Sequence, residues 1–209
     1  MTTLPPNATT FTYADRSKWR QPDEGWYDEP DKVQWIDAAT GRRCLVVRGP
    51  TGALCGYVGV TEGHPWFGVK WHGSDDSPGA VCDVHGGLTY SNYGAKSEAY
   101  PERFIHFVGD DTRVWYFGFD CNHLYDSSPM DDYRDGTYRT LGYVIREVER
   151  LAKQVEGVAK KKADPLTPFL RAAAEILPET PDDYALVQVG NVWLTAGDFR
   201  GLGRVGGGK

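Results

Sequence analysis

The sequence predicts an α+β fold: a twisted, mainly antiparallel sheet covered by an amphipathic helix, with a C-terminal helix-hairpin appendage. Runs of strand-forming residues separated by turn residues extend from about Arg43 to Asp120. Apolar residues then recur every three or four positions between Tyr138 and Val155, which is typical of a helix with one buried face. The 25 Gly, 13 Pro and 13% aromatic residues favour turns and strands over long helices.

The first segment, residues 1–42, is polar, acidic and punctuated by proline. It also carries four large aromatic side chains that a solvated tail would not need, at Trp19, Trp26, Tyr27 and Trp35. We therefore expect an N-terminal arm that packs irregularly on the body of the protein.

Residues 43–157 form the predicted core domain, which begins with a hairpin. The runs Cys44–Arg48 and Leu54–Val60 are rich in strand formers, and the Gly-Pro-Thr-Gly sequence between them has the chemistry of a turn.

Two further pairs of strands are expected in the core domain. Ala80–His85 and Leu88–Ser91 form a strand pattern that two glycines interrupt. Arg103–Val108 and Arg113–Asp120 flank a Gly-Asp-Asp-Thr turn and predict a second hairpin.

The last third, residues 158–209, is predicted to form the appendage. A helix over Pro165–Leu177 begins just after a capping aspartate, with proline at the first helical position. A hairpin of Tyr184–Val189 and Val192–Thr195 follows, and Gly201–Lys209 is too glycine-rich to pack.

Charge and composition exclude several classes of function. The 23 Lys and Arg against 29 Asp and Glu leave a net charge of -6, the wrong sign for a polynucleotide-binding surface. No basic-then-apolar leader or bilayer-length apolar run is found, so no membrane partner is expected. The four scattered cysteines are expected to be free thiols in a reducing cytoplasm.

Two short stretches at predicted strand ends concentrate the chemistry. Asp83 and His85 lie two residues apart and project from one face of a strand, whereas Asp120 ends another strand just before His123. If these strands are neighbours, two carboxylates and two imidazoles converge. Such a set suits a divalent metal ion or an oriented acid/base pair. All four residues are therefore predicted as metal ligands and catalytic groups.

Further residues nearby are predicted to bind a small-molecule ligand. Glycines would let the ligand approach, aromatic rings would stack on a base, and a cation would hold an anionic group. The predicted ligand-binding residues are Gly86, Gly87, Tyr90, Trp66, Trp71, Arg113, Asn122 and Asp126.

Structural roles compete with these predictions. Asp120 and Asp126 are also typical of turns, in which an aspartate accepts hydrogen bonds from backbone amides, and His85 is also compatible with a structural histidine. A structural zinc site is disfavoured by its unconventional spacing; its ligands would be Cys82, His85, Cys121 and His123.

Familiar catalytic motifs are missing from the sequence: there is no GxSxG elbow, Walker loop, GxGxxG turn or HExxH helix. Asp83-Val84-His85-Gly86 is similar to the opening motif of metallophosphoesterases, but no later paired-histidine motif follows it. That likeness therefore carries no assignment.

The stretch from Arg43 to Val155 resembles a family of uncharacterised proteins encoded by phages and bacterial genomes. The matching motifs are GYVGV with EGHP at Gly56–Pro65, DVHGGLTY at Asp83–Tyr90, WYFGFDCNH at Trp115–His123, and the helix at Tyr138–Gln154. The resemblance implies a phage or prophage accessory protein that acts in the cytoplasm of a host bacterial cell. It implies no established activity.

Three functions remain open from the sequence. The first is metal-assisted hydrolysis of a small phosphate-containing or nucleotide-like ligand, such as a host immune signalling nucleotide. The second is a non-catalytic binder that sequesters such a ligand. The third is a protein-interaction module that uses the N-terminal arm and the C-terminal hairpin, and a homo-oligomer is compatible with it.

Overall fold

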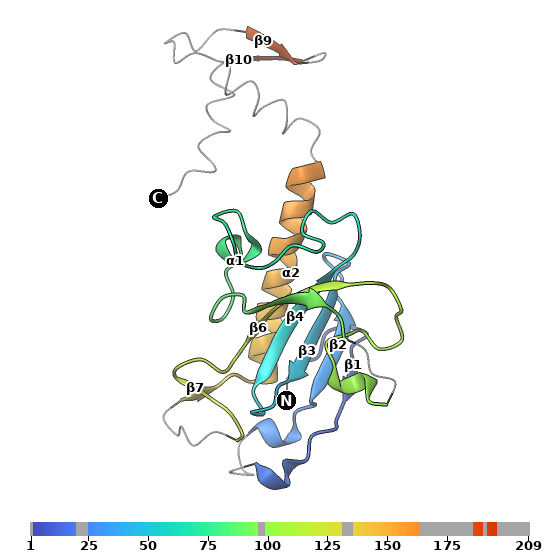
Figure 1. Cartoon of the computed structure of the whole chain (residues 1–209), viewed down its shortest axis with the longest axis vertical. Helices are drawn as coiled ribbons and strands as arrows, with labels where there is room; N and C mark the ends of the chain where they lie inside the picture. The colour runs from blue at the N-terminus through green and yellow to red at the C-terminus, as the bar shows by residue number, and fades with distance from the viewer. Residues whose placement is uncertain are drawn as a thin grey trace. The chain divides into compact units, whose positions relative to one another are not determined.

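The computed structural model describes residues 2–19, 25–95, 99–130, 136–163, 186–189 and 192–195. The chain divides into two compact units, Met1–Val158 and Ala159–Lys209. In the first unit a six-stranded antiparallel sheet packs against one long helix, which makes the fold α+β (Figure 1). Among the described residues, no helix is long and apolar enough to cross a membrane.

The sheet has the strand order β1-β2-β3-β4-β6-β5, and every neighbouring pair is antiparallel. Its strands are β1 Thr9–Phe11, β2 Lys32–Ile36, β3 Arg43–Arg48, β4 Leu54–Val60, β5 Tyr90–Tyr93 and β6 Trp115–Asp120. The helices are α1 Pro78–Val81 and α2 Leu141–Ala163, with 3-10 turns η1 Arg16–Lys18, η2 Gly25–Asp28 and η3 Pro101–Arg103. A small parallel pair is formed by β7 Asp126–Ser127 and β8 Thr137–Tyr138.

The predicted hairpin of β3 and β4 is confirmed, with Cys44 opposite Val58. The turn places Gly52 at φ +86°, a backbone conformation that is unfavourable for residues with a Cβ atom and that glycine adopts easily. Strand β6 pairs with β4 on one side and with β5 on the other, not with its predicted partner at residues 103–108, and its last residue, Asp120, lies opposite Cys55.

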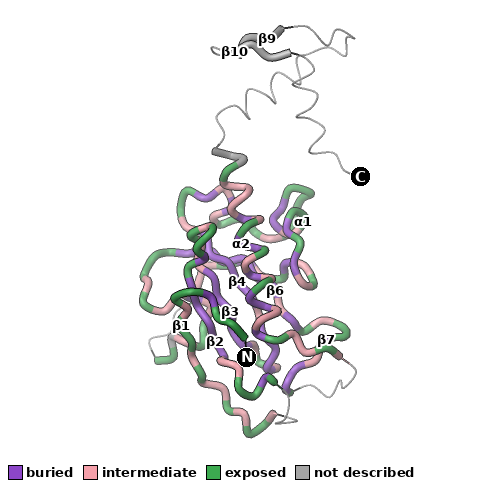
Figure 2. Tube along the Cα trace, turned by 180° about the vertical axis from the view of Figure 1, so that it is seen from behind, coloured by how far each residue is buried: buried purple, intermediate pink, exposed green. Residues whose placement is uncertain are grey.

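The main core lies between the sheet and α2. Apolar residues of α2 at helical spacing, including Val144, Val148 and Leu151, are fully buried against strand residues such as Val58 and Phe117. Figure 2 shows the buried positions gathered along the central strands and α2. The predicted covering helix is therefore confirmed, and it continues beyond its predicted end.

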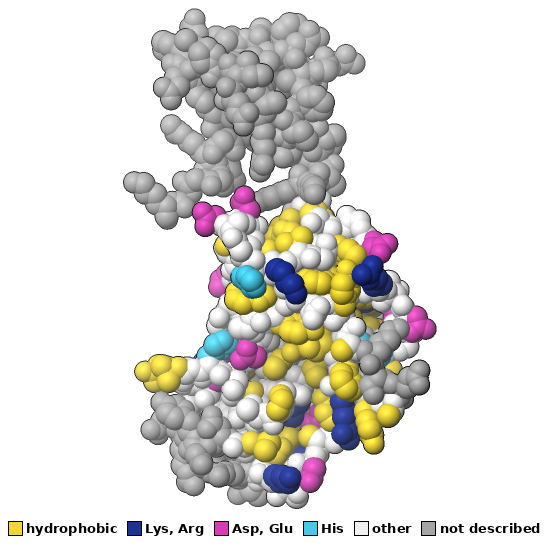
Figure 3. Space-filling view, in the orientation of Figure 1, with side chains coloured by type: hydrophobic (Ala, Val, Ile, Leu, Met, Phe, Trp, Pro, Cys, Tyr) yellow, Lys and Arg dark blue, Asp and Glu magenta, His cyan; other side chains and the backbone are white. Residues whose placement is uncertain are grey.

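The opposite face of the sheet is covered by a loop instead of a strand. Lys32 Nζ donates hydrogen bonds to the backbone oxygens of Phe104 and His106, and Gln34 exchanges two hydrogen bonds with the Val108 backbone. The predicted strand Arg103–Val108 is therefore wrong, because side chains of β2 take the backbone groups that a strand would offer to a neighbour. From this side, hydrophobic side chains form a band interrupted by cations (Figure 3).

The predicted strand Ala80–His85 is also wrong. The first residues of this segment belong to the short helix α1, in which Pro78 occupies the first helical turn. Beyond α1, the Asp83 backbone exchanges hydrogen bonds with the Gln154 side chain of α2, and the His85 amide donates to Glu147. Helix side chains thus hold this segment extended without a strand partner, and the strand predicted after it appears as β5.

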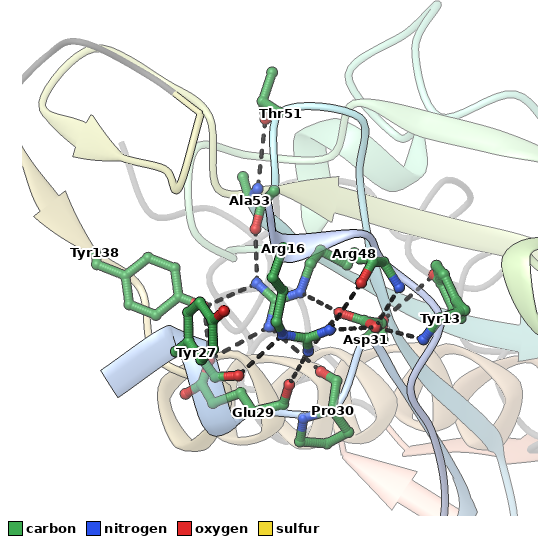
Figure 4. A network of polar contacts seen from close by, with 12 residues as sticks. Tyr13, Arg16, Tyr27, Glu29, Pro30, Asp31, Arg48, Thr51, Ala53 and Tyr138 are labelled. Atoms are coloured by element: carbon green, nitrogen blue, oxygen red, sulfur yellow. Dashed lines mark hydrogen bonds and ion pairs between the residues drawn. The ribbon is translucent and has the colours of Figure 1, made fainter. Parts of the chain in front are cut away.

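The first 42 residues contribute two strands to the sheet, so the expectation of purely irregular packing is corrected. A buried ionic network holds this segment to the body (Figure 4). Asp31 accepts hydrogen bonds from Arg16 and from Arg48, and Glu29 accepts from the Tyr138 hydroxyl and from the first amide of α2. Trp35 fills the main core from β2, which explains one of the aromatic side chains of this segment.

The second unit contains β9 Leu186–Val189 and β10 Val192–Thr195, which pair antiparallel. The predicted helix at residues 165–177 and the glycine-rich end at 201–209 lie outside the described residues. The appendage therefore stays a prediction.

Candidate metal centre

A buried carboxylate forms the centre of the site. Asp126 is only 5% exposed and lies where the turn after β6 meets the segment after α1. Its Oδ2 accepts hydrogen bonds from His85 Nε2 at 2.8 Å and from the His123 amide at 3.0 Å. Its Oδ1 accepts from Arg139 Nε at 2.8 Å.

Two glycines shape the His85 side of the site. Gly86 and Gly87 have φ of +65° and +82°, so the chain turns sharply directly after His85. A Cβ atom at Gly86 would overlap the His123 ring, whereas one at Gly87 would meet nothing within 4 Å. Gly86 therefore lets the two imidazoles approach, with ring centroids 5.5 Å apart.

The turn after β6 presents His123. Asp120 Oδ1 accepts a hydrogen bond from the Asn122 amide, and the Asp126 amide donates to the His123 backbone oxygen. Tyr125 has a positive φ of 70°, which is unusual for a residue other than glycine. Backbone conformations of this kind cluster at functional sites.

Opposing effects act on the Asp126 carboxyl. Burial acts to raise its pKa, but hydrogen bonds from His85, Arg139 and His123 outweigh burial and lower the pKa below its usual value. Asp126 is therefore ionised and can accept hydrogen bonds or hold a cation. The same ion pair raises the pKa of Arg139.

His85, His123 and Asp126 form a group that could hold a metal ion. One ligand atom from each lies within 4.8 Å of the others. His123 Nδ1 is 3.7 Å from Asp126 Oδ2, and this buried nitrogen has no hydrogen-bond partner among the described residues. Two imidazoles and one carboxylate are donors that divalent transition metals favour.

The structure brings together part of the predicted ligand set. Asp120 Oδ1 lies 3.8 Å from His123 Nδ1, at the edge of the group. The Asp83 side chain is 87% exposed and pairs with Arg150 instead. Asp120 has both oxygens engaged, because Thr89 donates to its other oxygen.

Half of the eight predicted ligand-binding residues lie away from this group. Trp66 is buried in the main core against Phe117, and Trp71 packs at the edge of that core. Tyr90 contacts Tyr57 on the opposite face of the sheet. Arg113 precedes β6, at the far end of the strand from Asp120.

Asn122, predicted to bind ligand, is exposed beside the group, and its side chain contacts Thr51. Cys82 and Cys121 are buried free thiols in the main core, and neither belongs to the metal-binding group. Burial raises the pKa of Cys82 to about 11.

Sequence reasoning missed Tyr143 and Arg139. The Tyr143 hydroxyl lies 3.1 Å from His85 Nδ1, so His85 is held at both ring nitrogens. A signal was present, because Tyr143, Glu147 and Gln154 recur at helical spacing beside the apolar face of α2. This polar stripe contacts the segment that carries His85.

Comparison of the chain with protein-family models, curated proteins and solved structures gives no match. Function is therefore inferred from the geometry and chemistry of the site.

Proposed function

We propose that the protein is a metal-dependent hydrolase of a small phosphate-containing ligand, with one divalent ion held by His85, His123 and Asp126. The observation that carries the proposal is the convergence of two imidazoles on a buried, ionised carboxylate, with ligand atoms within 4.8 Å of one another. The uncovered position of His123, whose side chain is 33% exposed, gives a ligand access to the group.

His85, His123 and Asp126 would hold the ion, which when bound would supply a Lewis acid that lowers the pKa of a water molecule. Hydrolysis would add the oxygen of that water to phosphorus, break the phosphorus–oxygen bond to the leaving group and pass a proton from the water to the departing oxygen. The Arg139 cation, held beside the site by Asp126, would stabilise the negative charge of the phosphoryl group.

The hydrogen bond between Tyr143 and His85 gives Tyr143 a positioning role. If His85 held the metal through Nε2, its ring proton would be on Nδ1, and the Tyr143 hydroxyl oxygen could accept a hydrogen bond from that N–H. Metal binding would then replace the hydrogen bond from His85 to Asp126. Metal-binding histidines commonly donate their second N–H to a fixed acceptor in this way.

The resemblance to phage-encoded proteins favours a host nucleotide as substrate. The acidic net charge disfavours polynucleotides, whereas a small phosphorylated ligand needs only the local cation. Sequestration without cleavage is the alternative. Mass spectrometry of ligands released by heat from protein purified out of host cells distinguishes the two, because a binder releases its ligand intact.

A second candidate is acid–base catalysis without a metal. The chain of contacts from Asp126 through His85 to Tyr143 favours it, because a carboxylate fixes the orientation of the imidazole. In that case hydrolysis would continue in excess chelator. Metal-dependent hydrolysis would stop in excess chelator, and it would return once the chelator is removed and one equivalent of Zn²⁺ or Mn²⁺ is added.

Metal titration of the purified chain tests the proposal. The wild type should bind one Zn²⁺ per chain, and His123→Gln should weaken binding by more than about tenfold. Asp83→Asn is the matched control, because that side chain is exposed and lies outside the group; it should bind as the wild type does. Equal affinities for wild type and His123→Gln would exclude this site.

Hydrolysis of bis(4-nitrophenyl) phosphate, with the metal identified by elemental analysis, tests the activity. Turnover should require the bound ion and should be lost in His123→Gln. If the metal-loaded wild type hydrolysed neither this diester nor 4-nitrophenyl phosphate, the metal centre would stand but the proposed hydrolase activity would be contradicted.

A further inference from the structure

A four-residue turn joins two members of the metal-binding group. It begins at His123 and ends at Asp126, whose amide donates a hydrogen bond to the His123 backbone oxygen at 2.9 Å. Its central residues are each next to one of these two in the chain: Leu124 follows His123, and Tyr125 precedes Asp126. Because consecutive Cα atoms are only about 3.8 Å apart, a compound held at the metal centre lies beside this turn.

The two central side chains of the turn are apolar and exposed. Leu124 is 76% exposed and Tyr125 is 64% exposed, the two highest values among the large hydrophobic residues that the structure describes. The Tyr125 side chain makes no ring contact or hydrogen bond with another described residue. Single exposed hydrophobic residues are normal, whereas adjacent ones beside a functional site favour a surface that binds a ligand.

The conformation of the turn is unfavourable for tyrosine. Tyr125 has a φ of 70°, and the third position of a turn with positive φ is usually taken by glycine or asparagine. The backbone is nevertheless held in place, because the Tyr125 oxygen accepts a hydrogen bond from the Thr137 amide at 2.8 Å. Stability alone would favour glycine at this position, and the described contacts give the tyrosine ring no structural role.

A cation beside the same carboxylate suits the phosphate end of a ligand. Arg139 Nε donates to Asp126 Oδ1, while the two terminal nitrogens of this guanidinium have no hydrogen-bond partner among the described residues. A guanidinium with free N–H groups matches the geometry of phosphate oxygens. A phosphate held by the ion and Arg139 would leave the organic group that it carries for the turn to contact.

We infer that the Leu124–Tyr125 turn recognises the organic group of the substrate, and that this group is an aromatic ring, such as a nucleobase, which stacks on Tyr125. The inference rests on the proposed function, because the metal ion and Arg139 would hold the phosphate. Aromatic pairs contribute more than the area that they bury, so a flat ring is favoured over an aliphatic group of the same size. Tyr125 thereby becomes a specificity-determining residue.

Phenylphosphonate, methylphosphonate and cyclohexylphosphonate test the inference, because their phosphorus–carbon bonds resist hydrolysis and only the first carries an aromatic ring. Calorimetric titration of the zinc-loaded wild type should show that phenylphosphonate binds most tightly. Tyr125→Gly should weaken phenylphosphonate by at least about fivefold, the loss of one stacking contact, and should leave methylphosphonate unchanged. Tyr125→Phe is the matched control, because it keeps the ring, and it should bind all three as the wild type does.

Thermal melting separates recognition from folding. Tyr125→Gly should bind Zn²⁺ as the wild type does and should melt at the same or a higher temperature, because glycine adopts a positive φ without strain. Unchanged phenylphosphonate affinity in Tyr125→Gly, or equal weakening of all three phosphonates, would overturn the inference and leave the metal centre in place. A zinc-loaded wild type that binds none of the phosphonates would overturn both the inference and the proposed function.

Discussion

At the scale of single residues, the site depends on a glycine as much as on its ligands. Gly86 combines a positive φ with a position at which any side chain would meet the His123 imidazole. The neighbouring Gly87 shares the positive φ and has open space around it. Substitutions at the two glycines therefore distinguish the effect of backbone strain, which both would cause, from crowding of the His123 ring, which only a substitution at Gly86 would cause.

Gly86→Ala should displace His123 and weaken Zn²⁺ binding by more than about tenfold. Gly87→Ala should cost a similar amount of stability through backbone strain, about 1 kcal/mol, but should keep the affinity of the wild type. Calorimetric titration and thermal melting measure the two effects. Similar Zn²⁺ affinities in the two variants would show that metal binding does not require the close contact between the His123 ring and Gly86.

A buried histidine links the loop after β4 to α2. His64 Nε2 lies 3.1 Å from the Val155 backbone oxygen, and His64 Nδ1 accepts a hydrogen bond from the Trp66 amide. Burial lowers the pKa of His64, and the cation of Arg42 acts in the same direction. The folded protein therefore keeps this imidazole neutral at pH values where the unfolded chain protonates it.

This pKa shift makes stability depend on pH. Below about pH 6.5 the unfolded chain binds a proton at His64 that the folded chain does not, so the free energy of unfolding falls as the pH is lowered. Urea denaturation at pH 7.5 and 5.5 should show a smaller loss for His64→Gln than for the wild type. An equal loss in both proteins would mean that His64 does not contribute.

At the scale of elements, glycine sets the distance between α2 and the sheet. A Cβ at Gly56 of β4 would lie 2.5 Å from the Phe119 ring and 2.6 Å from Val148 of α2. Gly157 lies in α2 itself, where a Cβ would meet nothing within 4 Å. The two positions predict opposite effects of the same substitution.

Gly56→Ala should lower the free energy of unfolding by about 1–3 kcal/mol, because the added methyl group overpacks the core. Gly157→Ala should raise it by about 0.5–1 kcal/mol, because alanine is the better helix former. Chemical denaturation of both variants provides the measurement. A neutral Gly56→Ala would show that α2 can move away from β4 at little cost.

The elements also show what sequence can and cannot predict. The β3–β4 hairpin and α2 follow from local patterns of turn residues and apolar spacing, and both are confirmed. The segment at Ala80–His85 alternates like a strand, but its backbone bonds to Gln154 and Glu147, about sixty to seventy residues later. Such side-chain partners leave no local signal in the segment that they bind.

The same limit explains the candidate site. His85 and His123 were predicted together on the assumption of neighbouring strands, and they meet through a glycine turn instead. The sequence predicts Asp126 as a ligand-binding residue rather than a metal ligand, because an aspartate in a turn is common in any sequence. Its central place follows from Arg139 and the His123 amide, which only the fold brings to it.

At the scale of the whole first unit, one ionic network joins three segments. Asp31 is fully buried and accepts hydrogen bonds from Arg48 of β3, from Arg16 and from the Tyr13 amide. Glu29 accepts from the first amide of α2. The N-terminal segment, the sheet and the helix are therefore held at one point.

Asp31→Ala should destabilise the protein by about 3–5 kcal/mol, because it leaves the buried Arg48 without its closest carboxylate. Asp76→Ala, at an exposed carboxylate, is the control and should change stability by less than about 0.5 kcal/mol. Denaturant titration gives both values. A loss below about 1 kcal/mol for Asp31→Ala would show that the network is dispensable.

The function proposed above depends on one metal ion held by His85, His123 and Asp126. Anomalous diffraction at the zinc edge, from crystals grown with one equivalent of Zn²⁺, shows where the ion binds. A single strong peak bounded by these three side chains is expected. A peak elsewhere, or no peak with His85 Nε2 still hydrogen-bonded to Asp126, would rule out this metal centre.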